Sequence, residues 1–276
     1  MADVYTVSAL AAALEVARAH GVSTKAPEIL HERSNVLVRL GSVVARVPAT
    51  TLLLRPDPTP WLALDVALSR YLTECDVPVV SPTTDPPAGP HFAQGLPVTL
   101  WHYTPHGPGG ELPIADIAAS LARVHEALRE YPGELPEHGP LDDVHRMLDL
   151  HGHTMDGAAG ELRAEAVRIA AELPDEPAQA LHGDAHPGNV VATEAGPCWL
   201  DFEDAWRGPL GWDLGAFVKQ AGPDVLVSYP GRVTVASLEP FTRLRNLFEV
   251  PWRYLIAQRY PHRLGEAREA LSRYFG

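Results

Sequence analysis

The chain has 276 residues, of which 46% are hydrophobic and 21% are charged, so it is long enough for one large domain or two lobes with a sizeable core. Asp and Glu number 35 against 22 Lys and Arg, a formal net charge of −13, and this balance argues against nucleic acid as a partner because phosphate contacts need clustered cations. Cys75 and Cys198, the only cysteines, stand in no metal-binding or redox spacing, which favours a reducing cytoplasm.

The first third of the chain combines helical and strand-like patterns. Gly41-Ser42 is a two-residue hairpin signal between two β-like runs. Apolar residues at helical spacing indicate a helix before these runs and another after the prolines at 56, 58 and 60. The expected helices are 7–20 and 61–75, and the expected strands are 26–31, 35–40, 43–47 and 97–103.

The remainder is mostly helical. We expect helices at 114–131, 142–151 and 161–173, short strands at 189–192 and 198–202, and helices from 214 to 275 interrupted at Pro223, Pro230, Pro240 and Pro251. A small lobe of residues 1–97 thus precedes a larger lobe of residues 98–276. The second lobe holds 26 acids and 15 bases, net −11, against 9 and 7, net −2, in the first.

No segment is typical of a membrane protein or a secreted one. No apolar run approaches the roughly 18 residues that a membrane span needs. The N-terminus carries Asp3 and lacks a basic region, so we expect an amphipathic helix there and no signal peptide. The expected location is the cytoplasm.

One segment carries a pattern suited to phosphoryl transfer. Asp184 and Asn189, in His182-Gly-Asp-Ala-His-Pro-Gly-Asn189, have the D-x-x-x-x-N spacing of a kinase catalytic loop. Asp201 opens a D-F-x triplet after the next short strand. A carboxylate at Asp184 can accept the proton of an attacking hydroxyl, and oxygens of Asn189 and Asp201 suit Mg²⁺.

In these residues the chain resembles the aminoglycoside phosphotransferase and choline-kinase-like family of the protein-kinase-like fold. The shared features are Leu121-Ala-Arg-Val-His125, the loop 182–189, Asp201-Phe-Glu203 in place of D-F-G, and Trp212-Asp213. The resemblance spans roughly residues 25–220. It implies a two-lobed α+β fold with the site between a nucleotide-side lobe and an acceptor lobe, and transfer of the γ-phosphoryl group of ATP or GTP to a small-molecule hydroxyl.

The resemblance also implies roles for individual residues. Asp184 would be the catalytic base or orienting carboxylate, Asn189 and Asp201 would hold Mg²⁺, and Tyr103 and Thr104 would lie along the adenine. Asp213 and His182 would brace the catalytic loop from within the protein.

Two positions depart from the family pattern. Arg46 stands in the third strand-like run, where the family places a phosphate-binding Lys, and Asp65 stands in the next helix, where it places Glu. Arg is longer than Lys and Asp is shorter than Glu, so the two side chains can still meet and serve the nucleotide. Because Lys and Arg are not interchangeable phosphate ligands, a catalytically weak nucleotide-binding protein is an alternative function, and a simple interior salt bridge is an alternative role for the pair.

The acceptor is less defined. Trp206 can belong to the core or line the acceptor site, and Glu203 and Asp204 can be solvated or face an acceptor amine. The acidic second lobe favours a cationic acceptor, such as an aminoglycoside-like antibiotic, since an acidic cleft concentrates cations.

Two further patterns have other interpretations. His182, Asp184 and His186 together resemble the ligands of a zinc-dependent hydrolase, but that interpretation leaves Asn189 and Asp201 unexplained. The run 107–110 is glycine-rich, yet no GK[ST] follows, so we expect a plain loop rather than a phosphate cradle.

Overall fold

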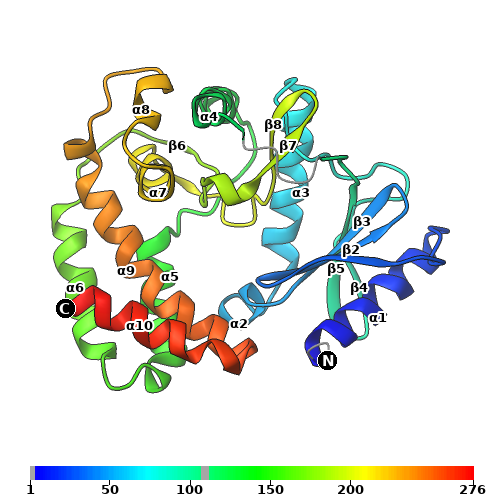
Figure 1. Cartoon of the computed structure of the whole chain (residues 1–276), viewed down its shortest axis with the longest axis horizontal. Helices are drawn as coiled ribbons and strands as arrows, with labels where there is room; N and C mark the ends of the chain where they lie inside the picture. The colour runs from blue at the N-terminus through cyan, green and yellow to red at the C-terminus, as the bar shows by residue number, and fades with distance from the viewer. Residues whose placement is uncertain (1–3, 107–111) are drawn as a thin grey trace.

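The computed structural model describes residues 4–106 and 112–276; the glycine-rich run 107–110 lies outside the described residues. Figure 1 shows a sheet with one long helix on its outer side and, opposite, a larger group of helices. The architecture is α+β with two lobes, as expected. Among the described residues, no helix is both long enough and apolar enough to cross a membrane.

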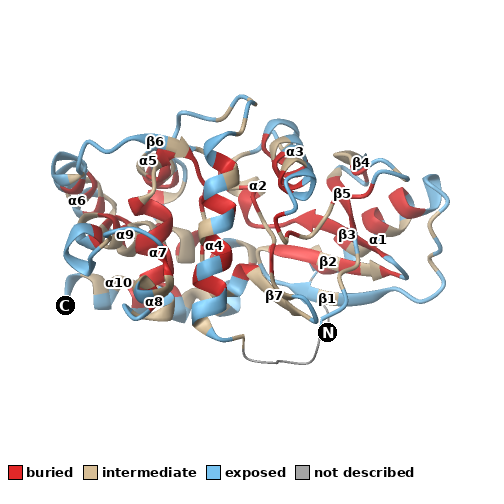
Figure 2. Ribbon diagram, turned by 90° about the horizontal axis from the view of Figure 1, so that it is seen from above, coloured by how far each residue is buried: buried red, intermediate tan, exposed pale blue. Residues whose placement is uncertain are grey.

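The small lobe is a five-stranded antiparallel sheet in the order β1-β2-β3-β5-β4. The predicted hairpin pairs β2 with β3 in an unbroken register from Asn35 opposite Pro48 to Leu40 opposite Val43. The strands are β1 (Glu28–Glu32), β2 (Asn35–Leu40), β3 (Val43–Pro48), β4 (His91–Ala93) and β5 (Leu96–His102). In Figure 2, β3 is buried along its length, whereas β1 is an exposed edge.

Alternation along β3 separates two sets of side chains. Val43, Ala45 and Val47 pack with the buried alanines of α1 (Val4–Ala19). Val44 faces the other way, packs with Val66 of α3 (Thr59–Glu74), and shares its face of the strand with Arg46. The strand therefore delivers Arg46 to the side of the sheet on which α3 and the larger lobe lie.

The larger lobe is built around α9 (Val235–Arg259), which contacts α5, α6, α7 and α10. Its core also takes in Leu68 and Leu72 of α3, so this helix connects the two lobes. The other helices are α2 (Thr51–Leu54), α4 (Ile114–Arg129), α5 (Pro140–His151), α6 (Ala159–Glu172), α7 (Gly211–Ala221), α8 (Val225–Ser228) and α10 (Leu264–Phe275), with one-turn 3₁₀ segments at Gly152–Thr154, Pro187–Asn189 and Pro261–Arg263.

Two short antiparallel pairs carry the loops of the kinase pattern. β7 (Val190–Thr193) pairs with β8 (Gly196–Trp199), and β6 (Ala178–Ala180) pairs with β9 (Arg207–Pro209). The catalytic loop joins β6 to β7, and the D-F-E segment joins β8 to β9. The two functional segments therefore leave neighbouring strand ends.

The expected helix breaks at Pro240 and Pro251 were wrong, because both prolines lie inside α9. A proline in a helix removes one backbone hydrogen bond and costs several kcal/mol when nothing offsets it. Here Phe241, Leu244 and Tyr254 are buried along the same helix, and the packing they provide outweighs the local penalty.

Candidate active site

Asp213 holds the catalytic loop from the interior. Its carboxylate accepts hydrogen bonds from the backbone N–H groups of His182 (2.8 Å) and Gly183 (3.0 Å), and it lies 3.0 Å from Nε2 of His125. Asp213 is fully buried, and buried carboxylates require such donors. The loop position of Asp184 is thereby tied to α4 and α7.

His182 is a bracing residue whose two ring nitrogens are both engaged. Nε2 donates to the carbonyl of Leu200 at 3.1 Å, and Nδ1 accepts from the backbone N–H of Asp184 at 3.3 Å. These bonds select the neutral Nε2–H tautomer. Burial lowers the pKa of His182 to about 4 despite the attraction of Asp213 and Asp184. With no free nitrogen, His182 is not placed to bind zinc.

The side chain of Asp184 has partners on both oxygens. Arg245 of α9 forms an ion pair with Oδ1. Nδ2 of Asn189 lies 3.2 Å from Oδ2, and Nε2 of His186 lies 3.3 Å from the same oxygen. Burial would raise the pKa of Asp184, but Arg245 and the two histidines outweigh burial and hold the pKa well below its usual range. Asp184 is therefore a firmly ionised carboxylate.

Arg46 and Asp65 meet, and Arg46 also binds the D-F-E segment. Its Nη1 pairs with Asp65, while its Nη2 contacts both Asp201 and Glu203. Asp65 in turn accepts a hydrogen bond from the backbone N–H of Phe202 at 3.0 Å. The sequence predicted one partner for Arg46, and the structure provides three.

This cluster has more negative charge than positive charge. Arg46 is 5% exposed and faces three carboxylates, so full ionisation leaves an excess of two negative charges in a buried environment. Burial raises the pKa of Asp65 to about 6, of Asp201 to about 7 and of Glu203 to about 8, even though Arg46 lowers all three. The surplus suits a divalent cation.

The residues present also fit Mg²⁺ by their donor chemistry. Asn189 turns its amide nitrogen toward Asp184, with 2.9 Å to the main-chain oxygen, which leaves its amide oxygen for a ligand. Asp201 lies on the same structural unit, because the N–H of Leu200 donates to the carbonyl of Asn189 at 3.0 Å. Asp201 itself has φ of +72°, a conformation that is uncommon for a residue other than glycine.

A cavity of about 790 Å³ opens beside Gly183 of the loop and Glu203 of the carboxylate cluster. Its wall includes Glu203, Asp204 and Trp206, the three residues suggested for acceptor binding, together with Gly183, Trp212 and Arg245. The Trp206 ring is held between two glycines: a Cβ on Gly139 would lie 2.5 Å from the ring and one on Gly208 would lie 2.3 Å from it. This part of the wall is therefore rigid.

The sequence did not indicate two arginines of this wall. Arg55 pairs with Asp143 and, at 2.9 Å, with Asp204, and it donates to the carbonyl of Glu203 at 3.2 Å. Arg245 contacts Asp184 from a helix whose sequence shows only ordinary amphipathic spacing. Neither arginine belongs to a motif, and only the tertiary fold brings them to the site.

Tyr103 and Thr104 follow β5 at the sheet edge. The backbone N–H of Tyr103 donates to the carbonyl of Ser42 at 2.8 Å, and Arg39 stacks over the Tyr103 ring at 3.6 Å. The N–H of Tyr103 is thus engaged within the sheet. The assignment of both residues to the adenine site stays a prediction.

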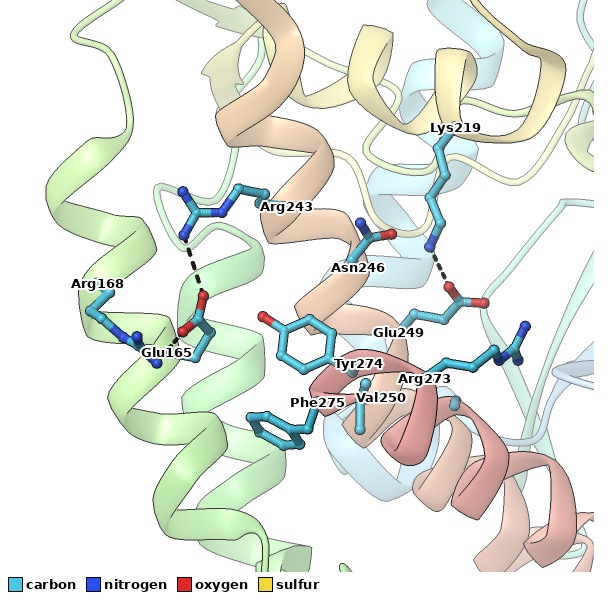
Figure 3. Close-up of a pocket in the computed structure, with 11 residues that line it drawn as sticks. Glu165, Arg168, Lys219, Arg243, Asn246, Glu249, Val250, Arg273, Tyr274 and Phe275 are labelled. Carbon is cyan, nitrogen blue, oxygen red and sulfur yellow. Dashed lines mark hydrogen bonds and ion pairs between the residues drawn. The ribbon is translucent and has the colours of Figure 1, made fainter.

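A second hollow lies across α9 from this cavity. It has a volume of about 520 Å³ and is lined from α6, α7, α9 and α10 (Figure 3). Five of its charged side chains pair with each other: Lys219 with Glu249, and Arg243 and Arg168 with Glu165. None of the described residues along its wall belongs to the loop 182–189, whereas Gly183 lines the larger cavity.

Comparison with known families identifies a match over most of the chain. The sequence model of the phosphotransferase enzyme family matches residues 35–243. Among curated proteins, methylthioribose kinase 1 from Oryza sativa subsp. japonica is 34% identical over 58 residues, which are 21% of this chain; the match spans only 14% of that protein's length.

Several solved structures share the fold. A structure of amicoumacin kinase hAmiN in complex with AMP-PNP, Ca²⁺ and Ami superposes with a TM-score of 0.68 at 12% identity, covering 94% of this chain and 93% of that one. The GDP and kanamycin complex of APH(2")-IIia gives 0.67 at 17% identity, with 95% and 97% covered. Choline kinase LicA from Streptococcus pneumoniae gives 0.63 at 14% identity, with 95% and 99% covered.

Proposed function

The chain belongs to the phosphotransferase enzyme family, and we propose that it is a small-molecule kinase that transfers the γ-phosphoryl group of ATP or GTP to a hydroxyl group. The observation that carries this proposal is the distribution of charge in the site. One carboxylate, Asp184, is held ionised, and beside it three carboxylates share the single guanidinium of Arg46. Phosphoryl transfer needs both a group that orients and deprotonates the attacking hydroxyl and a binding site for the metal ion that accompanies the nucleotide.

In the proposed reaction, Asp184 orients the acceptor hydroxyl and takes up its proton. The bond from that oxygen to the γ-phosphorus forms as the bond from the γ-phosphorus to the β–γ bridging oxygen breaks, and the nucleoside diphosphate leaves. The low pKa of Asp184 suits a carboxylate that mainly positions the hydroxyl and receives its proton late. Asn189 and the Asp213-held backbone keep that carboxylate in place.

Asn189 and Asp201 would hold Mg²⁺, which when bound offsets the negative charge of the phosphates. Arg46 keeps Asp201 and Glu203 together and would face the nucleotide with Asp65 behind it. Tyr103 and Thr104 would flank the base. Glu203, Asp204 and Trp206 form the wall of the acceptor cavity. These assignments divide the protein into a nucleotide side, residues 1–97, and an acceptor side, residues 98–276; the division falls within β5.

We propose an amine-bearing acceptor, for which an antibiotic of the aminoglycoside type is one example. Two residues that line the cavity support this, because Glu134 and Asp142 are exposed and no guanidinium pairs with either of them in the described part of the chain. Carboxylates in such a position attract a cationic group.

The test is release of the nucleoside diphosphate, with ATP and with GTP, over a panel of hydroxylated antibiotics and metabolites in the presence and absence of Mg²⁺. We expect Mg²⁺-dependent transfer to at least one amine-bearing compound. Asp184→Ala and Asp201→Ala should each lower kcat by at least ~10²-fold, the scale of a positioned acid–base or metal-binding group, and His186→Ala should cost much less. Nucleotide binding without transfer to any compound would contradict the proposal, as would loss of activity on zinc chelation.

A further inference from the structure

The acceptor cavity contains one guanidinium that reaches the catalytic carboxylate. Arg245 projects from α9, forms an ion pair with Oδ1 of Asp184, and lies 5.4 Å from the ring of Trp212 and 5.6 Å from that of Phe248. Its side chain is 13% exposed. Trp212, Phe248 and Arg245 all line the cavity, so the cation has a fixed place in the cavity wall.

The hydrogen-bonding capacity of Arg245 is only partly used. Nη2 contacts Asp184, while Nε and Nη1 donate to no protein acceptor in residues 4–106 and 112–276, and neither atom is sealed from solvent without a partner. Arg55 of the same wall differs, since Asp143, Asp204 and the Glu203 carbonyl occupy its donors. A planar guanidinium with a free edge binds carboxylate or phosphate oxygens in pairs.

The unpaired donors of Arg245 lie close to the place that the reacting hydroxyl would occupy. In the proposed reaction that hydroxyl lies within hydrogen-bond distance of Asp184, and the Arg245 guanidinium is already in contact with the same carboxylate. A substituent two or three bonds from the hydroxyl therefore lies against Arg245. An ammonium group there would be repelled, and a neutral group would leave the donors without an acceptor in a partly desolvated wall.

Building on the proposed function, we infer that Arg245 is a specificity-determining residue that binds an oxyanion group, carboxylate or phosphate ester, carried by the acceptor next to the hydroxyl that is phosphorylated. The amine of the acceptor then lies away from Arg245, beside exposed carboxylates that line the cavity, such as Glu134 and Asp142. The acceptor class is a hydroxylated molecule with its negative group near the reacting oxygen and its positive group away from it.

The test compares probes that differ in the oxyanion alone. Glycerate and glycerol 3-phosphate carry it and glycerol does not. Likewise, 4-amino-2-hydroxybutanoate carries it beside the hydroxyl, with the amine at the other end, and 3-aminopropan-1-ol does not. For each probe, kcat and KM for transfer are measured for wild type, Arg245→Met, Arg245→Lys and Arg253→Met. Arg253 lies on the same helix and pairs with Glu249 outside the cavity, so its substitution removes the same charge without touching the site. Thermal stabilisation by each probe, with the nucleotide present, is measured in parallel.

We expect wild type and Arg253→Met to favour the oxyanion probes at least tenfold in kcat/KM and to be stabilised by them. Arg245→Met should lose this preference mainly through KM, and Arg245→Lys should keep part of it. Glycerate against glycerol 3-phosphate separates carboxylate from phosphate recognition. Equal stabilisation of wild type and Arg245→Met by the oxyanion probes, or a uniform fall in kcat for all probes, would overturn the inference. Arg245-dependent stabilisation without transfer to any compound would overturn the proposed function alone.

Discussion

Replacement of Gly183 by alanine tests whether the close contact of the two functional loops sets the geometry of the site. Gly183 has φ of +87°, and a Cβ built on it lies 1.9 Å from the carbonyl oxygen of Asp204 and 3.0 Å from the backbone nitrogen of Ala205. Its own backbone is held on both sides, because its N–H donates to Asp213 and its carbonyl accepts from Nε1 of Trp212 at 2.6 Å. The side chain cannot be relieved by a rotamer change.

The size of the effect follows from these distances. Carbon and oxygen atoms that are not bonded stay about 3.0 Å apart or more, so the two loops must move apart by at least about 1.1 Å to admit the methyl group. The loop of Gly183 carries Asp184, and the loop of Asp204 carries Asp201 and Glu203. A displacement of about 1 Å between reacting groups can cost about 10²-fold in rate. The positive φ adds about 1–2 kcal/mol to the cost in stability.

Gly196 supplies a matched control. It has φ of +109°, is the first residue of β8 directly after the turn from β7, and has no atom within 4 Å of the position that a Cβ would take. Gly196→Ala thus carries a backbone penalty of the same kind without the loop clash. We expect Gly183→Ala to lower kcat by about 10²-fold, with a smaller change in nucleotide KM, and Gly196→Ala to leave kcat within about twofold while both lose stability by about 1 kcal/mol or more.

The measurements are steady-state kcat and KM with the acceptor found in the panel, and urea denaturation of each variant. If Gly183→Ala and Gly196→Ala lost stability equally and both kept kcat, the loops would tolerate separation. The close approach would then be a packing feature with no bearing on the alignment of Asp184 with Asp201.

Three further outcomes are expected. The pKa of His182 lies near 4 in the folded state and near 6.5 in the unfolded chain, so the wild type loses about 3 kcal/mol of stability as the pH falls from about 6.5 to 4. His182→Gln should lack this loss. Urea denaturation of both proteins at pH 7 and 4.5 tests it, and the same stability difference between them at both pH values would refute it. Arg46→Ala should raise the nucleotide KM and lower stability by about 3–5 kcal/mol, because it leaves buried carboxylates uncompensated. Asp65→Glu should restore part of the nucleotide affinity and stability lost in Arg46→Lys. Additive effects of the two substitutions in a double-mutant cycle would contradict this coupling. Asp213→Ala should lower the free energy of unfolding by about 3 kcal/mol or more, because two backbone N–H groups and a histidine ring lose their acceptor. Asp175→Ala, which removes an exposed carboxylate, should change it little in the same denaturation assay.

Local patterns predicted the parts of the structure whose causes are local. The hairpin at Gly41 formed as expected because its turn and its alternating strands agree. The alternation of β3 also placed Arg46 on the correct face. At Pro240 and Pro251 the local signal was overridden, since α9 is fixed by the buried side chains of four neighbouring helices.

The same contrast between local patterns and long-range contacts applies to the residues of the site. Asp184, Asn189 and Asp201 were singled out from spacing, and the structure places them on adjoining loops. Their roles in catalysis and metal binding stay predictions. The contacts of Arg46 with Asp201 and Glu203 join positions more than 150 residues apart, and that of Arg245 with Asp184 joins positions 61 apart. No spacing rule reports such contacts, so only the tertiary structure reveals which cation faces which carboxylate.

Those two arginines give the two halves of the site opposite electrostatic characters. On one side Arg245 compensates a single carboxylate, with His186 nearby, and the pKa of Asp184 is held low. On the other side Arg46 is shared by three carboxylates, and burial raises the pKa of Asp201 and Glu203 to about 7 and 8. A divalent cation gains most where negative charge is in excess, so in the proposed reaction it would bind at Asp201 and not at Asp184. Asp184 would then be available to the acceptor hydroxyl, and the unpaired donors of Arg245 to a negative group on the acceptor. On this proposal, the number of carboxylates around each arginine separates the metal-binding role from the hydroxyl-binding role.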